Sequence, residues 1–144
     1  KKLVEDFPKN IIGVKDSSYD LYENLNIKNF LVFPGSEAKL LKSLELGCSG
    51  IITATCNVTA NLSRKVYDDF FSNNEQSSNK KLCHVRSAFD NYNLISGLHS
   101  FYSQENKIYE NLLPPLRLLS QNEKNNLINI LKGLDFSIKS SMAA

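Results

Sequence analysis

The sequence predicts an α/β fold in its first half, followed by a segment made of helices. Three short apolar runs, at residues 11–15, 30–33 and 51–54, follow one another at nearly equal intervals. Continuous apolar runs of this length are typical of strands that are buried on both faces of a sheet. Stretches with helical spacing of their apolar residues separate the runs, and this alternation predicts parallel strands joined by right-handed crossovers.

Each predicted strand is followed by a signal for the start or the end of a helix. Ser17 or Ser18 can cap a short helix after the first strand, and Ser36 can cap the helix after the second. We expect that second helix to end at Gly47, because glycine readily adopts the backbone that terminates a helix. A further helix is predicted at about residues 60–72, after the third strand.

The second half of the chain is predicted to be helical. A polar loop at residues 72–79 separates it from the first half and is too short for a domain linker. The last helix is expected at 121–133, and the tail at 137–144 shows no periodicity. We therefore expect one structural domain, with three strand–helix units in residues 1–72 and the helical segment in residues 73–144.

The composition excludes several classes of function. Of the 144 residues, 42% are hydrophobic and 22% charged, and the net charge of +2 is too small to indicate nucleic-acid binding. No apolar stretch approaches the roughly 20 residues that a membrane span needs, and no secretory signal opens the chain. Three cysteines without a C-x-x-C pair favour reduced thiols in a cytoplasmic protein, and the spacing of Cys and His residues does not indicate a metal site.

The most informative residue is Lys15, which ends the first predicted strand and is followed by a turn rich in Asp and Ser. A free lysine has a pKa of about 10.4 and is protonated at neutral pH. Burial at the mouth of an α/β barrel lowers such a pKa and makes the amine available as a nucleophile. Taken alone, a strand-end lysine is more commonly a solvent-exposed residue, so the residue type by itself does not decide between the two.

Four motifs carry a resemblance to a known family. The sequence G-V-K-D-S-S at residues 13–18 is similar to the Schiff-base lysine motif of the dihydrodipicolinate synthase/N-acetylneuraminate lyase family. F-P-G-S-E at residues 33–37 resembles the loop after that family's seventh barrel strand, and residues 46–58 resemble its eighth strand. I-S-G-L at residues 95–98 and L-P-P-L at residues 113–116 resemble its C-terminal helices. The four occur in the family's order.

The resemblance implies a particular fold. Members of this family are class I pyruvate-type aldolases with a TIM (β/α)8 barrel, usually assembled as homotetramers. The chain would then be α/β, the C-terminal portion of a TIM barrel with about three β/α units, followed by a C-terminal helical segment. The family's tyrosine proton relay and its threonine pair that binds the 2-oxo acid carboxylate belong to earlier strands, which this chain does not contain.

The resemblance also implies an activity. Lys15 would form a Schiff base with pyruvate or another 2-oxo acid, and the resulting enamine would add to an aldehyde or leave when a carbon–carbon bond breaks, without metal or cofactor. Cleavage of a 2-keto-3-deoxy sugar acid or of 4-hydroxy-2-oxoglutarate is the favoured reaction, and dihydrodipicolinate synthesis is the close alternative. We expect a homo-oligomer. A hypothesis of another class is a non-catalytic half-barrel that self-associates through its open sheet edges.

Four further residues are candidates for substrate contact. Gly35 permits a close backbone approach and the Ser36 hydroxyl can bond a substrate oxygen, although a turn and a helix cap would use the same residues. Glu37 can bind a substrate hydroxyl or be a solvated carboxylate in the first turn of a helix. Ile52 stands where the family places an apolar residue against the 2-oxo acid.

The sequence departs from the family pattern at three positions. Tyr19 stands where the family commonly has glycine, and a positive φ there would strain a tyrosine. Ala54 replaces the hydroxyl residue of sialic-acid lyases, and Ala38 replaces an expected acid. Both changes argue against N-acetylneuraminate cleavage. Asn57 matches the family pattern, and we expect it to cap the last barrel helix or hold its loop.

Overall fold

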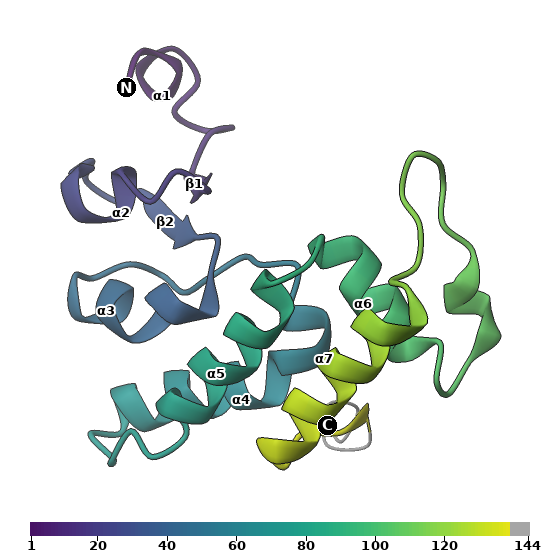
Figure 1. Ribbon diagram of the computed structural model, residues 1–144. Coiled ribbons are helices and arrows are strands. Elements are labelled where there is room, and N and C mark those ends of the chain that lie inside the picture. Colours follow the sequence, from purple (N-terminus) through teal and green to yellow (C-terminus); the bar gives the residue numbers. More distant parts are fainter. Residues whose placement is uncertain (139–144) are drawn as a thin grey trace.

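A computed structural model describes residues 1–138 of the chain. Its elements follow in the order α1 (Lys2–Asp6), β1 (Gly13–Asp16), α2 (Leu21–Asn24), β2 (Leu31–Pro34), the 3-10 helix η1 (Glu37–Lys39), α3 (Leu40–Glu45), α4 (Cys56–Phe71), α5 (Asn79–Asp90), α6 (Leu94–Tyr102), the 3-10 helix η2 (Lys107–Glu110) and α7 (Gln121–Gly133). Figure 1 shows the strands with α1 to α3 at one side of the molecule and the longer helices at the other. Most of the predicted tail, from residue 139 on, lies outside the described residues.

The sheet consists of β1 and β2, which pair in parallel with Lys15 opposite Phe33. The two strands approach closely at Gly13, where a Cβ atom would lie 2.8 Å from the carbonyl oxygen of Leu31. Side chains alternate between the two faces of a strand, and Val32 is buried while Lys15 and Leu31 are exposed. One face of the sheet is therefore packed in the molecule, and the other carries Lys15.

The third predicted strand, at residues 51–54, is not a strand. Its segment runs beside β2 and donates two backbone hydrogen bonds to it, from Ser49 N–H to Val32 O and from Ile52 N–H to Pro34 O, both at 3.1 Å. Gly50 between them has φ 141°, which interrupts the regular extended backbone. The segment keeps the expected place next to β2, but two hydrogen bonds around a glycine do not make a ladder.

The helix signals agree with the structure at most positions. The Ser36 hydroxyl accepts the backbone N–H of Ala38 at the start of η1, and the chain leaves α3 through Gly47 at φ 82°, so the predicted cap and end are confirmed. The last helix has the predicted bounds, and residues 72–78 form a loop between α4 and α5. By contrast, α4 begins at Cys56, earlier than predicted.

The core lies between the long helices. Val85, Phe89, Leu127 and Leu131 are at most 1% exposed and belong to a cluster built by α4, α5, α6 and α7. A smaller cluster joins α3, α4 and α5, and Leu82 is its contribution from α5. Figure 1 shows α5 in the middle of the molecule, beside α4 and α7. Because α5 belongs to both clusters, it connects the helical segment to the part that carries the strands.

Among residues 1–138, no helix has both the length and the apolar character that crossing a membrane requires. The thiols of Cys48, Cys56 and Cys83 are free. Within the same residues, His, Cys, Asp and Glu side chains form no group of three that could hold a metal ion.

Candidate active site

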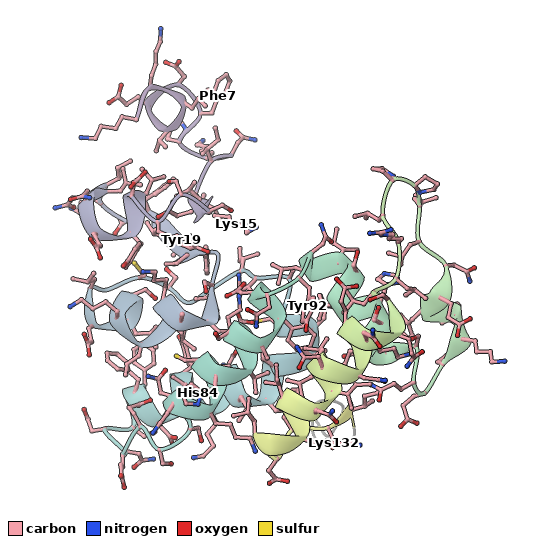
Figure 2. All side chains as sticks on the ribbon, in the orientation of Figure 1. Phe7, Lys15, Tyr19, His84, Tyr92 and Lys132 are labelled. Atoms are coloured by element: carbon pink, nitrogen blue, oxygen red, sulfur yellow. The ribbon has the colours of Figure 1, made fainter. Side chains whose placement is uncertain are left out.

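Lys15 is the penultimate residue of β1, next to the carboxyl end of the strand. In Figure 2 it lies on the side of the strands that faces away from α2. Its side chain is exposed, so residues 1–138 do not supply the desolvation that a reactive lysine requires. Because parallel strands end at the same edge of a sheet, the residues after β2 and after the neighbouring segment gather near this lysine.

The turn after Lys15 is organised by the carboxylate of Asp16, which is 1% exposed. It accepts the backbone N–H groups of Ser18, Tyr19, Leu21 and Tyr22 at 2.9–3.2 Å and the Ser18 hydroxyl at 2.9 Å. Burial alone would raise the pKa of Asp16, but these hydrogen bonds outweigh it and lower the pKa. Asp16 therefore caps α2, and the prediction that Ser17 or Ser18 does so is wrong.

Tyr19 has φ 65°, which lies in the left-handed region. The positive φ that would strain a tyrosine at this position is therefore present. An L-residue with a Cβ atom is strained there. The hydrogen bond from its N–H to Asp16 Oδ1, at 2.9 Å, holds it in this conformation. The turn thus places a tyrosine at a positive φ.

Gly35 and Ser36 follow β2 at the same edge. The Gly35 N–H donates to the carbonyl oxygen of Asp16 at 2.9 Å, and a Cβ atom on Gly35 would meet that oxygen and the Ser17 Oγ at 3.4 Å. The glycine therefore lets the end of β2 lie against the lysine turn. Ser36 is 5% exposed, and its hydroxyl serves as the cap described above.

Glu37 is fully buried, so the alternative in which it is a solvated carboxylate is wrong. Its Oε1 accepts the hydroxyls of Thr53 at 2.7 Å and Thr59 at 2.8 Å, and its Oε2 lies 3.0 Å from Nη1 of Arg86. Burial by itself would raise the pKa of Glu37. Hydrogen bonds from the neighbouring threonine hydroxyls, Thr55 first, outweigh burial, so the pKa is lowered. Both oxygens of the carboxylate that was a candidate for substrate contact are therefore bonded to protein groups.

Arg86 was not among the residues predicted from the sequence, although its place in the helix pattern offers a signal. Arg86 lies between Val85 and Phe89 on α5, and all three are buried. A charged residue at core spacing on an amphipathic helix needs a buried partner. The pattern does not say which residue that partner is, because Glu37 is 49 positions away.

A cavity of about 360 Å³ opens beside Ala54, just before α4. Its other lining residues are Asn57, Ile95, Leu98, His99, Tyr102 and Tyr109. The rings of Tyr102 and Tyr109 are stacked with centroids 5.0 Å apart, and His99 Nδ1 lies 2.8 Å from the carbonyl oxygen of Tyr109. Asn57 holds the loop, as expected, because its side-chain amide donates to the carbonyl oxygen of Ala54 at 2.8 Å.

Residues 1–134 match the Dihydrodipicolinate synthetase family. The chain belongs to this family. A 4-hydroxy-tetrahydrodipicolinate synthase of Buchnera aphidicola subsp. Cinara cedri is 40% identical over 57 residues, which are 36% of this chain and 19% of that enzyme. A 2-dehydro-3-deoxy-D-gluconate/2-dehydro-3-deoxy-phosphogluconate aldolase of Picrophilus torridus is 28% identical over 124 residues, which are 81% of this chain and 46% of that enzyme.

The solved structure of a monomeric dihydrodipicolinate synthase variant is also similar, with a TM-score of 0.80 and 20% identity. The match covers 93% of this chain and 48% of that one. This likeness confirms the predicted fold class, the C-terminal portion of a TIM barrel followed by a helical segment. The chain spans less than half the length of these three relatives.

Within this family fold, the predicted site residues fall into two groups. Lys15, Gly35 and Ile52 lie along one edge, joined by backbone hydrogen bonds between neighbouring segments. Ile52 is 48% exposed, so its side chain is available to a ligand. Ser36 and Glu37 come from the same edge, but their side chains bond to protein groups.

Proposed function

We propose that this chain carries the Schiff-base lysine of a lyase or aldolase of the dihydrodipicolinate synthase family that acts on pyruvate or another 2-oxo acid. The observation that carries the proposal is the position of Lys15, next to the carboxyl end of a strand in a family of barrel enzymes. The turn that Asp16 organises directly after it fixes where that strand end lies.

The chemistry needs an unprotonated amine and a ketone. The Lys15 Nζ attacks the ketone carbon of pyruvate to give a carbinolamine, which takes up a proton from solvent and loses water to leave a protonated imine. That imine withdraws electrons from the neighbouring carbon, which loses a proton to give an enamine. The enamine carbon then bonds to an aldehyde carbon, or in reverse is released when that bond breaks. Water finally frees the lysine, and no cofactor is consumed.

The other residues at this edge receive supporting roles in the proposal. The backbone at Gly35 and the apolar side chain of Ile52 would flank the bound 2-oxo acid, and Ser36 would reach a substrate oxygen only if its cap opened. Glu37 would act through Arg86 and the threonines rather than on substrate. The cavity beside Ala54 would hold the distal part of a longer substrate.

The two named relatives support different substrates. The longer match is to an aldolase of 2-dehydro-3-deoxy sugar acids, and the match with higher identity is to a 4-hydroxy-tetrahydrodipicolinate synthase. Cleavage of a 2-keto-3-deoxy sugar acid or 4-hydroxy-2-oxoglutarate is our main proposal, and dihydrodipicolinate synthesis is the alternative. Incubation with 2-dehydro-3-deoxy-D-gluconate, followed by measurement of released pyruvate, tests the main proposal. A chain that traps pyruvate but cleaves neither this sugar acid nor 4-hydroxy-2-oxoglutarate favours the alternative.

A second class of function is favoured by the exposed apolar residues around the sheet. Ile12, Leu31 and Ile52 are 59%, 41% and 48% exposed. A second copy of the chain that covers them would make a homo-oligomer, with or without catalysis. Sedimentation of the purified chain tests this: a monomer at micromolar concentration contradicts self-association.

Trapping with borohydride tests the proposed function directly. The chain is incubated with pyruvate, reduced, digested and examined by mass spectrometry, and we expect one reduced adduct on Lys15. The variant Lys15→Arg should carry none, whereas Lys28→Arg, which changes another exposed lysine, should be trapped like the parent. Absence of any adduct on Lys15 at saturating pyruvate contradicts the proposal for this chain.

A further inference from the structure

We infer that Arg86 is a positioning residue for the site at the strand ends, where it fixes the loop after β2 against the segment that leads into α4. The inference rests on the proposed function, because it assigns a role toward the 2-oxo acid that Lys15 would bind. Arg86 belongs to α5 and therefore to the helical segment that follows the strand–helix units. It gives that segment a part in shaping the site.

The guanidinium of Arg86 reaches both loops from one nitrogen. Its Nη1 lies 3.0 Å from Glu37 Oε2, 3.3 Å from the carbonyl oxygen of Gly35 and 3.3 Å from Thr55 Oγ1. Its Nε donates to Asp90 Oδ1 at 2.8 Å, which fixes the guanidinium plane relative to α5. A planar group held at Nε has little freedom to follow a loop that moves.

Glu37 extends this contact into a network. Besides Arg86, its carboxylate accepts the hydroxyls of Thr53 and Thr59, so it joins the start of η1 to both sides of the α4 N-terminus. The Oγ atoms of Thr53 and Thr55 are 3.0 Å apart, and Thr53 Oγ1 also accepts the Cys56 N–H. A shift of either loop against the other would break several buried hydrogen bonds at once.

The burial of the ion pair argues for a role in geometry. The side chains of Arg86 and Glu37 are 8% and 0% exposed. Removing two charges from water offsets much of their attraction, so such a pair adds little net stability compared with well-packed apolar residues. What the pair does supply is a fixed separation between the groups it joins. Here those groups include Gly35, which follows β2 beside the lysine turn.

Trapping of pyruvate at a series of concentrations tests the inference. In Arg86→Met we expect the half-saturating pyruvate concentration to rise about tenfold, because the guanidinium contacts to both loops are lost. Arg86→Lys keeps the charge and should restore part of the affinity. Arg64→Lys, which alters an exposed arginine on α4, should match the parent. A folded Arg86→Met with an unchanged half-saturating concentration overturns the inference. If Arg86→Met does not fold, an unchanged half-saturating concentration in Arg86→Lys overturns it.

Amide hydrogen exchange separates this inference from the proposed function. The N–H groups of Gly35, Ile52 and Cys56 donate to Asp16 O, Pro34 O and Thr53 Oγ1, and Arg86→Lys should speed their exchange about tenfold. The N–H of Tyr22, held by Asp16, should exchange as in the parent. Unchanged exchange at all three loop amides overturns the fixing of the loops. If the parent traps no pyruvate, the proposed function fails, and this measurement still decides whether Arg86 fixes the loops.

Discussion

The carboxylate of Asp16 accepts the backbone N–H of Tyr19 at 2.9 Å, and Tyr19 is held at φ 65°. The hydrogen bond and the left-handed backbone are parts of one turn, which begins directly after Lys15. Since Asp16 also caps α2 through the N–H groups of Leu21 and Tyr22, one buried carboxylate determines how the chain leaves the strand. The lysine is therefore attached to a rigid turn even though its own side chain is exposed.

The left-handed backbone at Tyr19 predicts a difference between two substitutions. Tyr19→Gly and Tyr19→Ala both remove the ring and its contact with the Lys39 ammonium 5.5 Å away, so the ring cancels in the comparison. Only glycine is free of the Cβ clash at this φ. We expect Tyr19→Gly to be about 1 kcal/mol more stable than Tyr19→Ala in urea unfolding. Equal stability of the two variants would show that the turn changes its backbone.

Replacement of Asp16 by asparagine should destabilise the chain. Asparagine offers one acceptor oxygen and turns a pair of donors toward N–H groups that the carboxylate now satisfies. We expect a loss of about 2 kcal/mol in the free energy of unfolding. Asp20→Asn is the matched control, because Asp20 is exposed and its side chain makes no cap bond to α2. A loss of similar size in the control would contradict the role given to Asp16.

Acid should destabilise the fold through Glu37 and Asp16. Both pKa values are lowered in the folded chain from ordinary values of 4.5 and 3.8. The stabilisation is therefore complete above these values and is lost as the pH falls through the folded pKa. Urea unfolding between about pH 6 and pH 3 should show a falling free energy of unfolding.

Substitution of Glu37 identifies its share of this acid sensitivity. Glu37→Gln should be less stable than the parent at neutral pH, because it removes the buried counter-charge of Arg86 and leaves only the half-exposed Asp90. Its stability should also fall less steeply with acid. Glu45→Gln, at an exposed carboxylate on α3, should keep the slope of the parent. A slope in Glu37→Gln identical to that of the parent would mean that other groups carry the acid sensitivity.

The features that the sequence predicted correctly have local causes. The cap at Ser36, the end of α3 before Gly47 and the bounds of α7 each depend on residues that are neighbours in the chain. The motif around Lys15 places it next to the end of a strand for the same reason. Propensity and capping act over a few residues, so a single sequence contains their signals.

The cap of α2 was missed although Asp16 lies only five residues before Leu21, but two other missed features depend on residues far apart in the chain. Whether residues 51–54 form a strand is decided by the hydrogen bonds that a neighbour offers, and their own apolar character cannot show this. The burial of Glu37 follows from Arg86 and two threonines on other elements. Of the residues in that contact, only Arg86 could be suspected from the sequence, because it is a charged residue on the buried face of a helix.

The space around Gly13 in β1 and around Gly133 in α7 predicts opposite results for their substitution by alanine. A Cβ atom on Gly13 would lie 2.8 Å from the carbonyl oxygen of Leu31 and 2.9 Å from its Cβ, so Gly13→Ala must push the strands apart and should cost about 1–3 kcal/mol. Gly133, at the end of α7, has no atom within 4 Å of such a Cβ, and Gly133→Ala should stabilise the helix by about 0.5–1 kcal/mol. Urea unfolding of both variants measures the difference. A Gly13→Ala chain as stable as the parent would contradict the strand spacing, and since Lys15 lies two residues further along β1, weaker trapping of pyruvate should accompany the destabilisation.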